Sequence, residues 1–260
     1  MGRKAHKMKR MARNIIIAII IVAVICGLVY SWQSRQQLDY RDCLEETAFT
    51  VDGQAVQMKW LGFYVVYEER EVEKQAQIYH ADNTADYWNL HVDGHFIRQD
   101  AKDTIMQMAI HDYIYYQKAQ AEGMTLDASE QRSLENTISD FWMDLLDDQV
   151  DNLPVTDEYI VETMQRIALA EKYQAALAAK KDRSYTSYSW NGGYYKKWLA
   201  KQDVEINDKI WDRVSVGNIT LKHDKVNYVN GQDEKDSDEN ENRKKRSMLV
   251  WKRKKVQTVS

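Results

Sequence analysis

An uncharged apolar run near the N-terminus constrains this chain more than any other feature. Residues 15 to 30 read IIIAIIIVAVICGLVY and contain no charged side chain. As a helix, residues 15 to 32 would be about 27 Å long, close to the ~30 Å thickness of the hydrocarbon core of a bilayer. The sequence therefore predicts a single transmembrane helix over residues 15 to 32.

The residues on either side of this run predict its orientation. Residues 1 to 14 form a basic segment, and Tyr30 and Trp32 lie where an interfacial aromatic belt is expected. The positive-inside rule places the basic segment in the cytoplasm and everything after Trp32 outside it, so we expect a single-pass protein of the cell membrane with an extracytoplasmic body. The alternative is a cleaved signal peptide, but no A-x-A-like cleavage site follows the run, which favours an uncleaved anchor.

The composition of the remaining chain indicates a mainly α fold. Only one proline and ten glycines occur in 260 residues, which is too few for the many turns of a β-sandwich. The charged fraction of 29% suits solvated helix faces. A net charge of −4 indicates no nucleic-acid partner.

Hydrophobic spacing and capping signals predict the helices of the exported part. Apolar residues recur at intervals of three, four and seven, as on one face of a helix. The predicted helices cover 58 to 80, 98 to 122, 127 to 148 and 156 to 180, with shorter ones over 194 to 202 and after an N-cap at Asn207. Gly123 is expected to end the second helix, Asp127 and Glu130 to form a capping box, and Thr156 to begin the fourth helix.

A small β element completes the predicted domain. Residues 48 to 56 favour strands around an Asp52-Gly53 turn, and we expect residues 214 to 221 to pair with them. Around the domain at 47 to 221 we expect a polar spacer at 33 to 46, and within it a linker at 183 to 193. Residues 222 to 260 read as a tail that is first acidic and then basic, a composition typical of disorder.

Two histidines four residues apart raise the question of a metal site. His91 and His95 could share a zinc ion if they lay on one helix face. Asp93-Gly94 between them is a turn signal, which places both histidines in a loop before the second long helix. We predict surface histidines and no metal or cofactor.

The two cysteines cannot pair within one chain while the predicted span is folded. Cys26 lies inside the span, whereas Cys43 follows it on the outer side. Cys43 is either an unreactive thiol or the site of an intermolecular disulfide.

Several short motifs resemble, in their order and spacing, the N-terminal chaperone domain of SurA and PrsA type, found in secreted foldases of the parvulin family. The motifs are Val51-x-Gly53-x-x-Val56, Trp88 followed by Asp93-Gly94, Ala119-x-x-x-Gly123-Met124-Thr125-Leu126 with Glu130, and Val204-x-Ile206-Asn207 with Trp211. The similarity covers about residues 47 to 180 and 194 to 221. The resemblance implies a helical chaperone domain outside the cytoplasm. It also implies that Tyr87 and Trp88 anchor the loop that carries His91 and His95.

The chain departs from that family where a catalytic domain is often inserted. Such foldases often carry a parvulin prolyl isomerase domain before their last helix, and here only the short segment 183 to 193 occupies that place. The resemblance therefore implies the chaperone scaffold without the catalysis. The sequence also lacks a G-x-S-x-G, Walker, H-E-x-x-H or paired-cysteine motif, so we predict no catalytic residue, although a foldase related to prolyl isomerases remains an alternative.

A chaperone of this kind would bind apolar segments of unfolded or secreted polypeptides. Burial of apolar surface contributes about 25 cal/mol per Å², and aromatic and methionine side chains adapt to many partners. The predicted client-binding residues are Trp60, Phe63, Tyr64, Tyr67, Tyr113, Tyr115 and Tyr116. The competing interpretation is that these aromatics form the core, and a second possible function is an envelope adaptor with one specific partner.

The basic end of the tail suggests contact with anionic lipids. Met248-Leu249-Val250-Trp251 is bracketed by basic residues, each worth about 1 kcal/mol near an anionic surface. The predicted lipid-contact residues are Arg243, Lys244, Lys245, Arg246, Trp251, Lys252, Arg253, Lys254 and Lys255. The alternative is a solvated, disordered tail.

Overall fold

The computed structural model describes residues 19–20, 22, 24–26, 37–80 and 82–223. The chain divides into two units, residues 1–38 and 39–260. Residues 19–20, 22 and 24–26 are helical, and no helix of the described residues is both long and apolar enough to cross a bilayer. Most of the predicted span lies outside these residues, so the membrane anchor stays a prediction.

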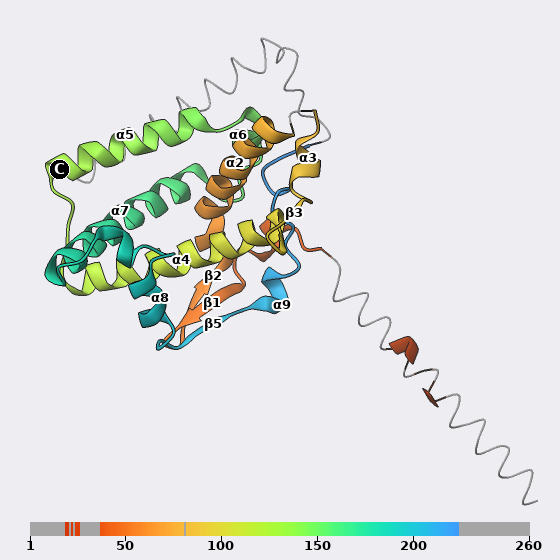
Figure 1. Cartoon of the computed structure of the whole chain (residues 1–260), viewed down its shortest axis with the longest axis horizontal. Coiled ribbons are helices and arrows are strands. Elements are labelled where there is room, and N and C mark those ends of the chain that lie inside the picture. The colour runs from red at the N-terminus through yellow and green to blue at the C-terminus, as the bar shows by residue number, and fades with distance from the viewer. Residues whose placement is uncertain (1–18, 21, 23, 27–36, 81, 224–260) are drawn as a thin grey trace, which may run out of the picture. The chain divides into compact units, whose positions relative to one another are not determined.

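The second unit is mainly helical, as predicted, and has a small sheet (Figure 1). Its long helices are α2 (Gly62–Tyr79), α4 (Ile97–Ala121), α5 (Ala128–Asp144) and α7 (Asp157–Lys180). The short α-helices are α3 (Thr84–Tyr87), α6 (Asp147–Asp151), α8 (Gly193–Leu199) and α9 (Asp208–Trp211). Single 3₁₀ turns form η1 (Tyr40–Cys43), η2 (Met58–Leu61) and η3 (Tyr185–Tyr188).

The capping signals begin and end these helices largely as predicted. Asp127 and Glu130 form the capping box of α5, and the Thr156 side chain caps α7 by accepting from the Tyr159 N–H at 3.3 Å. Gly123 has a φ of +67° just after α4. The single helix predicted over 127 to 148 is wrong, because Leu145 adopts an extended conformation and separates α5 from α6. That turn places the Leu145 side chain in the core.

The sheet joins the start of the unit to a segment near its end. Strands β1 (Thr47–Val51), β2 (Gln54–Gln57) and β5 (Val204–Ile206) are antiparallel in the order β2-β1-β5. The predicted Asp52-Gly53 turn connects β1 to β2, and both residues have a positive φ. The prediction that residues 214 to 221 pair with this hairpin is wrong, because β5 occupies that edge of β1. Asn207 does not cap α9 with its side chain, which instead donates to the Thr47 carbonyl at 2.8 Å.

Residues 214–223, which we call the C-terminal strap, run through the helical body without forming a strand. Most of the strap side chains are buried, namely Val214, Val216, Ile219, Thr220 and Leu221. A segment without a neighbouring strand must find other partners for its backbone N–H groups. Those partners are polar side chains of the helices and are described with the site.

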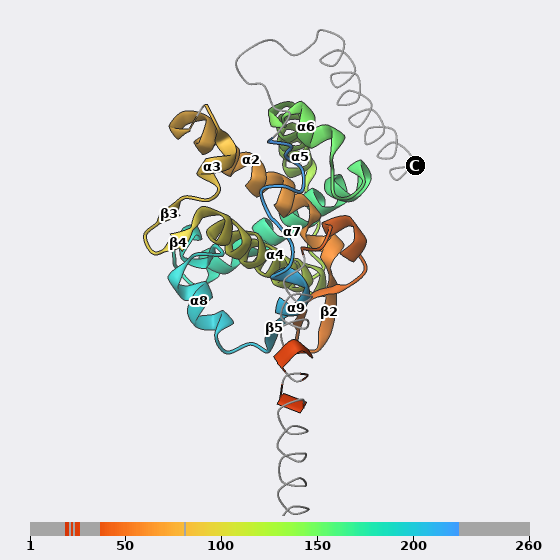
Figure 2. The same ribbon diagram turned by 90° about the vertical axis from the view of Figure 1, so that its right-hand side faces the viewer.

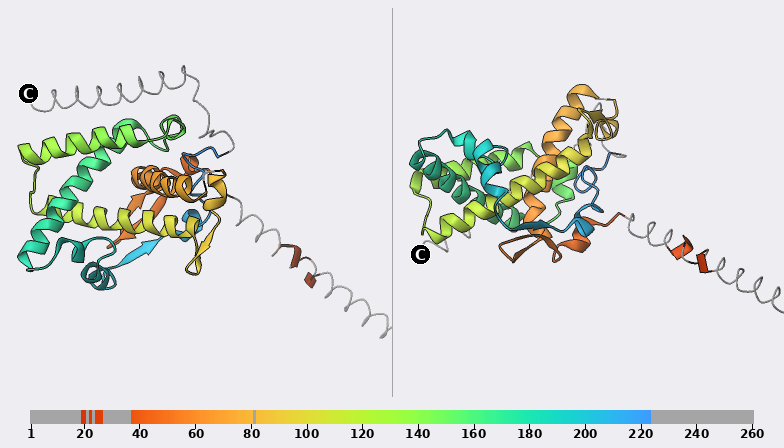
Figure 3. Two further views of the ribbon diagram at one scale, coloured as in Figure 1. Left: turned by 45° about the horizontal axis from the view of Figure 1, so that its top comes forward. Right: turned by 60° about the horizontal axis from the view of Figure 1, so that its bottom comes forward.

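Helix α5 packs on α2 and α7 through a compact apolar cluster. The cluster comprises Val66, Leu134, Ile138, Trp142, Leu145, Val150, Ile160, Val161 and Met164. The sheet and α5 lie on opposite sides of α4 (Figures 1 and 2), and the Phe49 ring meets the Tyr113 ring edge-on, which joins the sheet to α4. The left view of Figure 3 shows that α5 and α7 lie close together at the α6 end and diverge from there.

Two segments predicted as spacer and linker pack on the folded body. Tyr40 and Cys43 in η1 are buried, so the Cys43 thiol is not exposed for an intermolecular disulfide in this structure. Between α7 and α8, the side-chain amide of Gln174 donates to the Tyr185 carbonyl and to Ser189 Oγ, both at 3.0 Å. This segment, which includes η3, therefore lies against α7 rather than bridging two free parts.

We expect Gly217→Ala to destabilise the protein by about 3 kcal/mol. Gly217 has a φ of +90°, and an added Cβ would lie 2.6 Å from the Trp88 ring, so a side chain there meets both backbone strain and a clash. Gly193→Ala is the matched control, because nothing lies within 4 Å of its added Cβ. Urea unfolding should show a lower midpoint for the first variant only; equal midpoints would contradict the packing of the strap on Trp88.

Candidate functional site

Helix α2 carries two distinct groups of side chains on adjacent faces. One face presents Glu69 and Glu73 to the C-terminal strap, and the other presents Phe63 and Tyr67 to a groove. The first group is a buried polar cluster, and the second is an apolar surface. Their chemistry decides which of the two can bind a partner.

Glu69 binds the strap through its carboxylate, which is fully buried. Oε1 accepts from the backbone N–H groups of Gly217 at 2.6 Å and Ile219 at 3.1 Å. Oε2 accepts from the N–H of Thr220 at 2.8 Å and from its hydroxyl group. Burial raises the pKa of Glu69 above its usual range, although the hydrogen bonds from Thr220, Ile219 and Gly217 act in the opposite direction.

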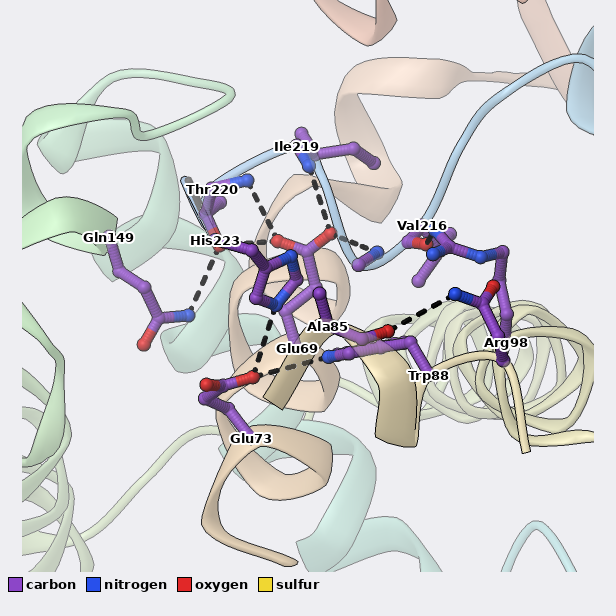
Figure 4. Close-up of polar contacts among 12 residues, drawn as sticks. Glu69, Glu73, Ala85, Trp88, Arg98, Gln149, Val216, Ile219, Thr220 and His223 are labelled. Atoms are coloured by element: carbon purple, nitrogen blue, oxygen red, sulfur yellow. Dashed lines mark hydrogen bonds and ion pairs between the residues drawn. The ribbon is translucent and has the colours of Figure 1, made fainter. Parts of the chain in front are cut away.

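The neighbouring polar side chains complete this cluster (Figure 4). Glu73 Oε2 accepts from Trp88 Nε1 at 3.2 Å and lies 3.3 Å from His223 Nε2. Gln149 of α6 donates to Thr220 Oγ1 at 3.1 Å. Arg98 of α4 donates to the Val216 carbonyl. Helices α2, α4 and α6 are thus all tied to the same strap.

This polar cluster is a structural feature rather than a binding site. Both oxygens of Glu69 already accept two hydrogen bonds each, so the carboxylate has little capacity left for a substrate. The bonds replace the strand partners that the strap lacks. The cluster therefore fixes the strap to the helices.

The groove lies between α2, α4, α5 and α7 and consists of two adjoining cavities. One has a volume of about 540 Å³ and the other about 640 Å³, and they share Phe63, Tyr67, Thr137 and Met164 in their walls. These volumes fall within the range typical of ligand-binding clefts, ~300–1,000 Å³. The apolar remainder of the wall includes Met108, Leu126, Leu134, Phe141, Met143, Leu145, Ile167 and Ala168.

The aromatic side chains of the groove form a continuous stack that is open to solvent. The Phe63 ring stacks on Tyr67 at 6.0 Å between centroids and contacts Phe141 at 5.3 Å. Tyr67 is 41% exposed and Met143 is 62% exposed, although both are large apolar side chains. Exposed apolar surface beside a concave site is typical of a binding surface.

Ion pairs border the groove at both ends. Asp144 lies 2.7 Å from Lys74 Nζ and 3.5 Å from Arg70 Nε, and Lys74 also pairs with Glu71 at 2.7 Å. At the other end Lys172 pairs with Glu130 at 2.7 Å. Such half-exposed pairs contribute little stability, about 0–1 kcal/mol each, so their main effect is on the charge pattern around the apolar wall.

A histidine and an aspartate near the groove do not form a catalytic pair. His111 Nδ1 lies 2.6 Å from Asp112 Oδ1, and Nε2 donates to the Tyr188 carbonyl at 2.9 Å. Tyr64 donates to the other Asp112 oxygen at 3.0 Å. Because both ring nitrogens of His111 are engaged, the ring has none left to take a proton from a substrate. The arrangement holds η3 against α4.

Two of the seven predicted client-binding residues have open positions in the groove. They are Phe63 and Tyr67. Tyr64 contributes atoms to the floor of the larger cavity, but its side chain is buried and bound to Asp112. Helix α2 alone therefore brings three of the predicted residues to one place.

The other four predicted residues lie elsewhere. Trp60 and Tyr115 are core residues, and they donate to the carbonyls of Ala109 and Tyr188. Tyr113 and Tyr116 are half-buried around the Trp60 ring. The alternative interpretation, that these aromatics form the core, describes Trp60, Tyr64 and Tyr115.

The wall of the groove also includes residues that the sequence analysis did not predict as client-binding residues. Phe141, Met143 and Met164 are three of them. A signal was present at Phe141-Trp142-Met143, because three consecutive large apolar residues on a helix cannot all face one core.

The remaining predicted sites are placed as follows. His91 and His95 are exposed on a hairpin of β3 (His91–Val92) and β4 (His95–Phe96), and no group of three or more metal-ligating side chains occurs among the described residues. Trp88 is fully buried, as an anchor of this loop should be. The predicted lipid-contact residues, Arg243 to Lys255, lie outside the described residues.

Comparison with known proteins gives no match for this chain among protein-family models, curated proteins or solved structures.

We expect Glu69→Ala to lower the free energy of unfolding by about 3 kcal/mol or more. The substitution leaves the N–H groups of the strap buried without their charged acceptor. Gln75→Ala, at an exposed position of the same helix, should change it by less than about 0.5 kcal/mol. Urea unfolding measures both. If the two variants unfolded alike, the carboxylate would not be holding the strap.

Proposed function

We propose that this protein is a chaperone-like protein that binds apolar segments of unfolded polypeptides in the groove. The observation that carries the proposal is the open wall of aromatic and methionine side chains along α2 and α5, with Tyr67 and Met143 substantially exposed. Such side chains offer large contact area and repack easily around different partners.

Two features of the unit support a scaffold of the SurA and PrsA type. Strand β5 returns from the end of the unit to pair with β1, and Trp211 just after it is buried, whereas Ile206 is largely exposed. The segment between α7 and α8 is short and packed against α7, which fits a scaffold without an inserted isomerase domain. These features support the proposal and do not depend on the groove.

We further propose that the body acts outside the cytoplasm, anchored by residues 15 to 32. The support for this location is the uncharged run and the basic segment before it. Secreted and envelope proteins are unfolded when they emerge from the membrane, so a tethered apolar groove would meet its clients there.

An adaptor with one specific partner is the second candidate function. The ion pairs of Asp144 with Arg70 and Lys74 set a fixed charge pattern at the edge of the groove, and such patterns give specificity. A photocrosslinker in place of Tyr67 in cells separates the two functions. Many crosslinked products support a chaperone, whereas one dominant product supports an adaptor.

We expect the full-length protein to delay aggregation of a chemically denatured test protein at an equimolar ratio. The double variant Tyr67→Asp/Met143→Asp should bind about tenfold more weakly, because two charges replace apolar contact area. Both side chains are exposed, so the fold should be retained.

Ile78→Asp is the matched control, since Ile78 is also on α2 and is 70% exposed but does not line the groove. It should delay aggregation as well as the unchanged protein. Equal activity of all three proteins, or equal loss in both variants, would contradict binding in the groove.

A further inference from the structure

Acidic side chains outnumber basic ones in the wall of the groove. The wall includes six carboxylates, those of Glu71, Asp112, Glu130, Asp140, Asp144 and Glu171, and three cations, those of Arg70, Lys74 and Lys172, so its formal net charge is −3. Glu130 pairs with Lys172, and Asp144 pairs with Arg70 and Lys74. Because the wall keeps a net negative charge when the cations of these pairs are counted, the groove attracts a basic segment that also has apolar side chains.

The chain itself contains such a segment in its tail. Residues 243–255 carry eight basic residues and no acidic one, a charge of +8, on both sides of Met248-Leu249-Val250-Trp251. Four consecutive apolar residues between two basic blocks match an apolar groove with an acidic border.

The C-terminal strap delivers this segment close to the groove. The described chain ends at His223, whose Nε2 lies 3.3 Å from Glu73 on α2. The next residue of α2 after Glu73 is Lys74, which lines the groove. Three residues earlier, Thr220 is bonded to Gln149 of the acidic α6. The tail therefore leaves the body at α2, on the face adjacent to the one that lines the groove.

The length of the connecting segment is more than sufficient. Between His223 and Met248 lie 24 residues, which span up to about 80 Å when extended. Helix α5 is only about 26 Å long. A tether of this length keeps the effective concentration of the segment near the groove in the millimolar range.

We propose that residues 243–255 dock at the groove of the same chain, with residues 248–251 beside Phe63, Tyr67 and Met143 and the basic residues next to the carboxylates of the groove wall. The tail then occupies the surface that a client needs. That consequence rests on the proposed function, whereas the docking itself does not. The docked state holds the groove shielded until a client displaces the tail.

Disulfide formation between engineered cysteines in the full-length protein tests the docking directly. In a Cys26→Ser background, Met143→Cys is combined with Leu249→Cys, and mild oxidation followed by peptide mapping gives the rate of the intrachain bond. The matched control combines Ile206→Cys, on β5 and away from the groove, with the same Leu249→Cys. Cys43 stays, because its thiol is buried.

We expect the disulfide of the Met143→Cys/Leu249→Cys variant (the Met143 pair) to form roughly tenfold faster than that of the Ile206→Cys/Leu249→Cys variant (the Ile206 pair). The reason is that docking raises the local concentration of residue 249 near the groove above the value that the tether alone supplies. Raising the salt concentration from about 0.1 M to about 1 M should slow only the Met143 pair. Equal rates would overturn the proposal. Products that link two chains would also overturn it, since a second copy would then be the occupant.

The same experiment distinguishes a lipid partner for the tail. If phosphatidylserine vesicles at modest concentration remove the advantage of the Met143 pair, the membrane rather than the groove is the preferred site and the proposal fails. Because the readout involves no client, a fast Met143 pair together with no effect on aggregation, either by the full-length protein or by a variant that lacks residues 243–255, would refute only the proposed function. A slow Met143 pair with retained aggregation activity would refute only the docking.

Discussion

The hydrogen bonds between the buried carboxylate of Glu69 and the backbone of the C-terminal strap determine how this unit is assembled. A fully buried carboxylate is costly unless several donors surround it, and Gly217, Ile219 and Thr220 supply those donors. The strap in turn lacks strand partners and depends on Glu69 for its N–H groups. Each side satisfies the other, which makes the last described residues an integral part of the helical body.

Because Glu69 and Glu73 use one face of α2 to bind the strap, the adjacent face of α2 stays available for binding. Helix α2 contacts the strap through Glu69 and Glu73, and α5 through Val66, while Phe63 and Tyr67 remain at the groove. The hydrogen bonds between Glu69 and the strap also fix the point at which the tail leaves the helical body. A single helix thus connects the stability of the fold, the proposed client surface and the segment that we propose to shield it.

The sequence predicted the features that depend on neighbouring residues. The capping box at Asp127 and Glu130 and the Asp52-Gly53 turn are local, and both are confirmed. The role of Glu69 was not predictable, because a glutamate in a helix is normally solvated and its partners here are about 150 residues away. For the same reason, aromatic content alone could not separate Tyr67 in the groove from Tyr115 in the core.

Amide hydrogen exchange of the strap tests the central claim most directly. If Glu69 holds the strap, the amides of Gly217, Ile219 and Thr220 should exchange only through global unfolding, as slowly as those in the middle of α4. Exchange as fast as that of the exposed β3–β4 hairpin would mean that the strap opens independently. In that case the carboxylate would not be what binds the end of the chain to the helices.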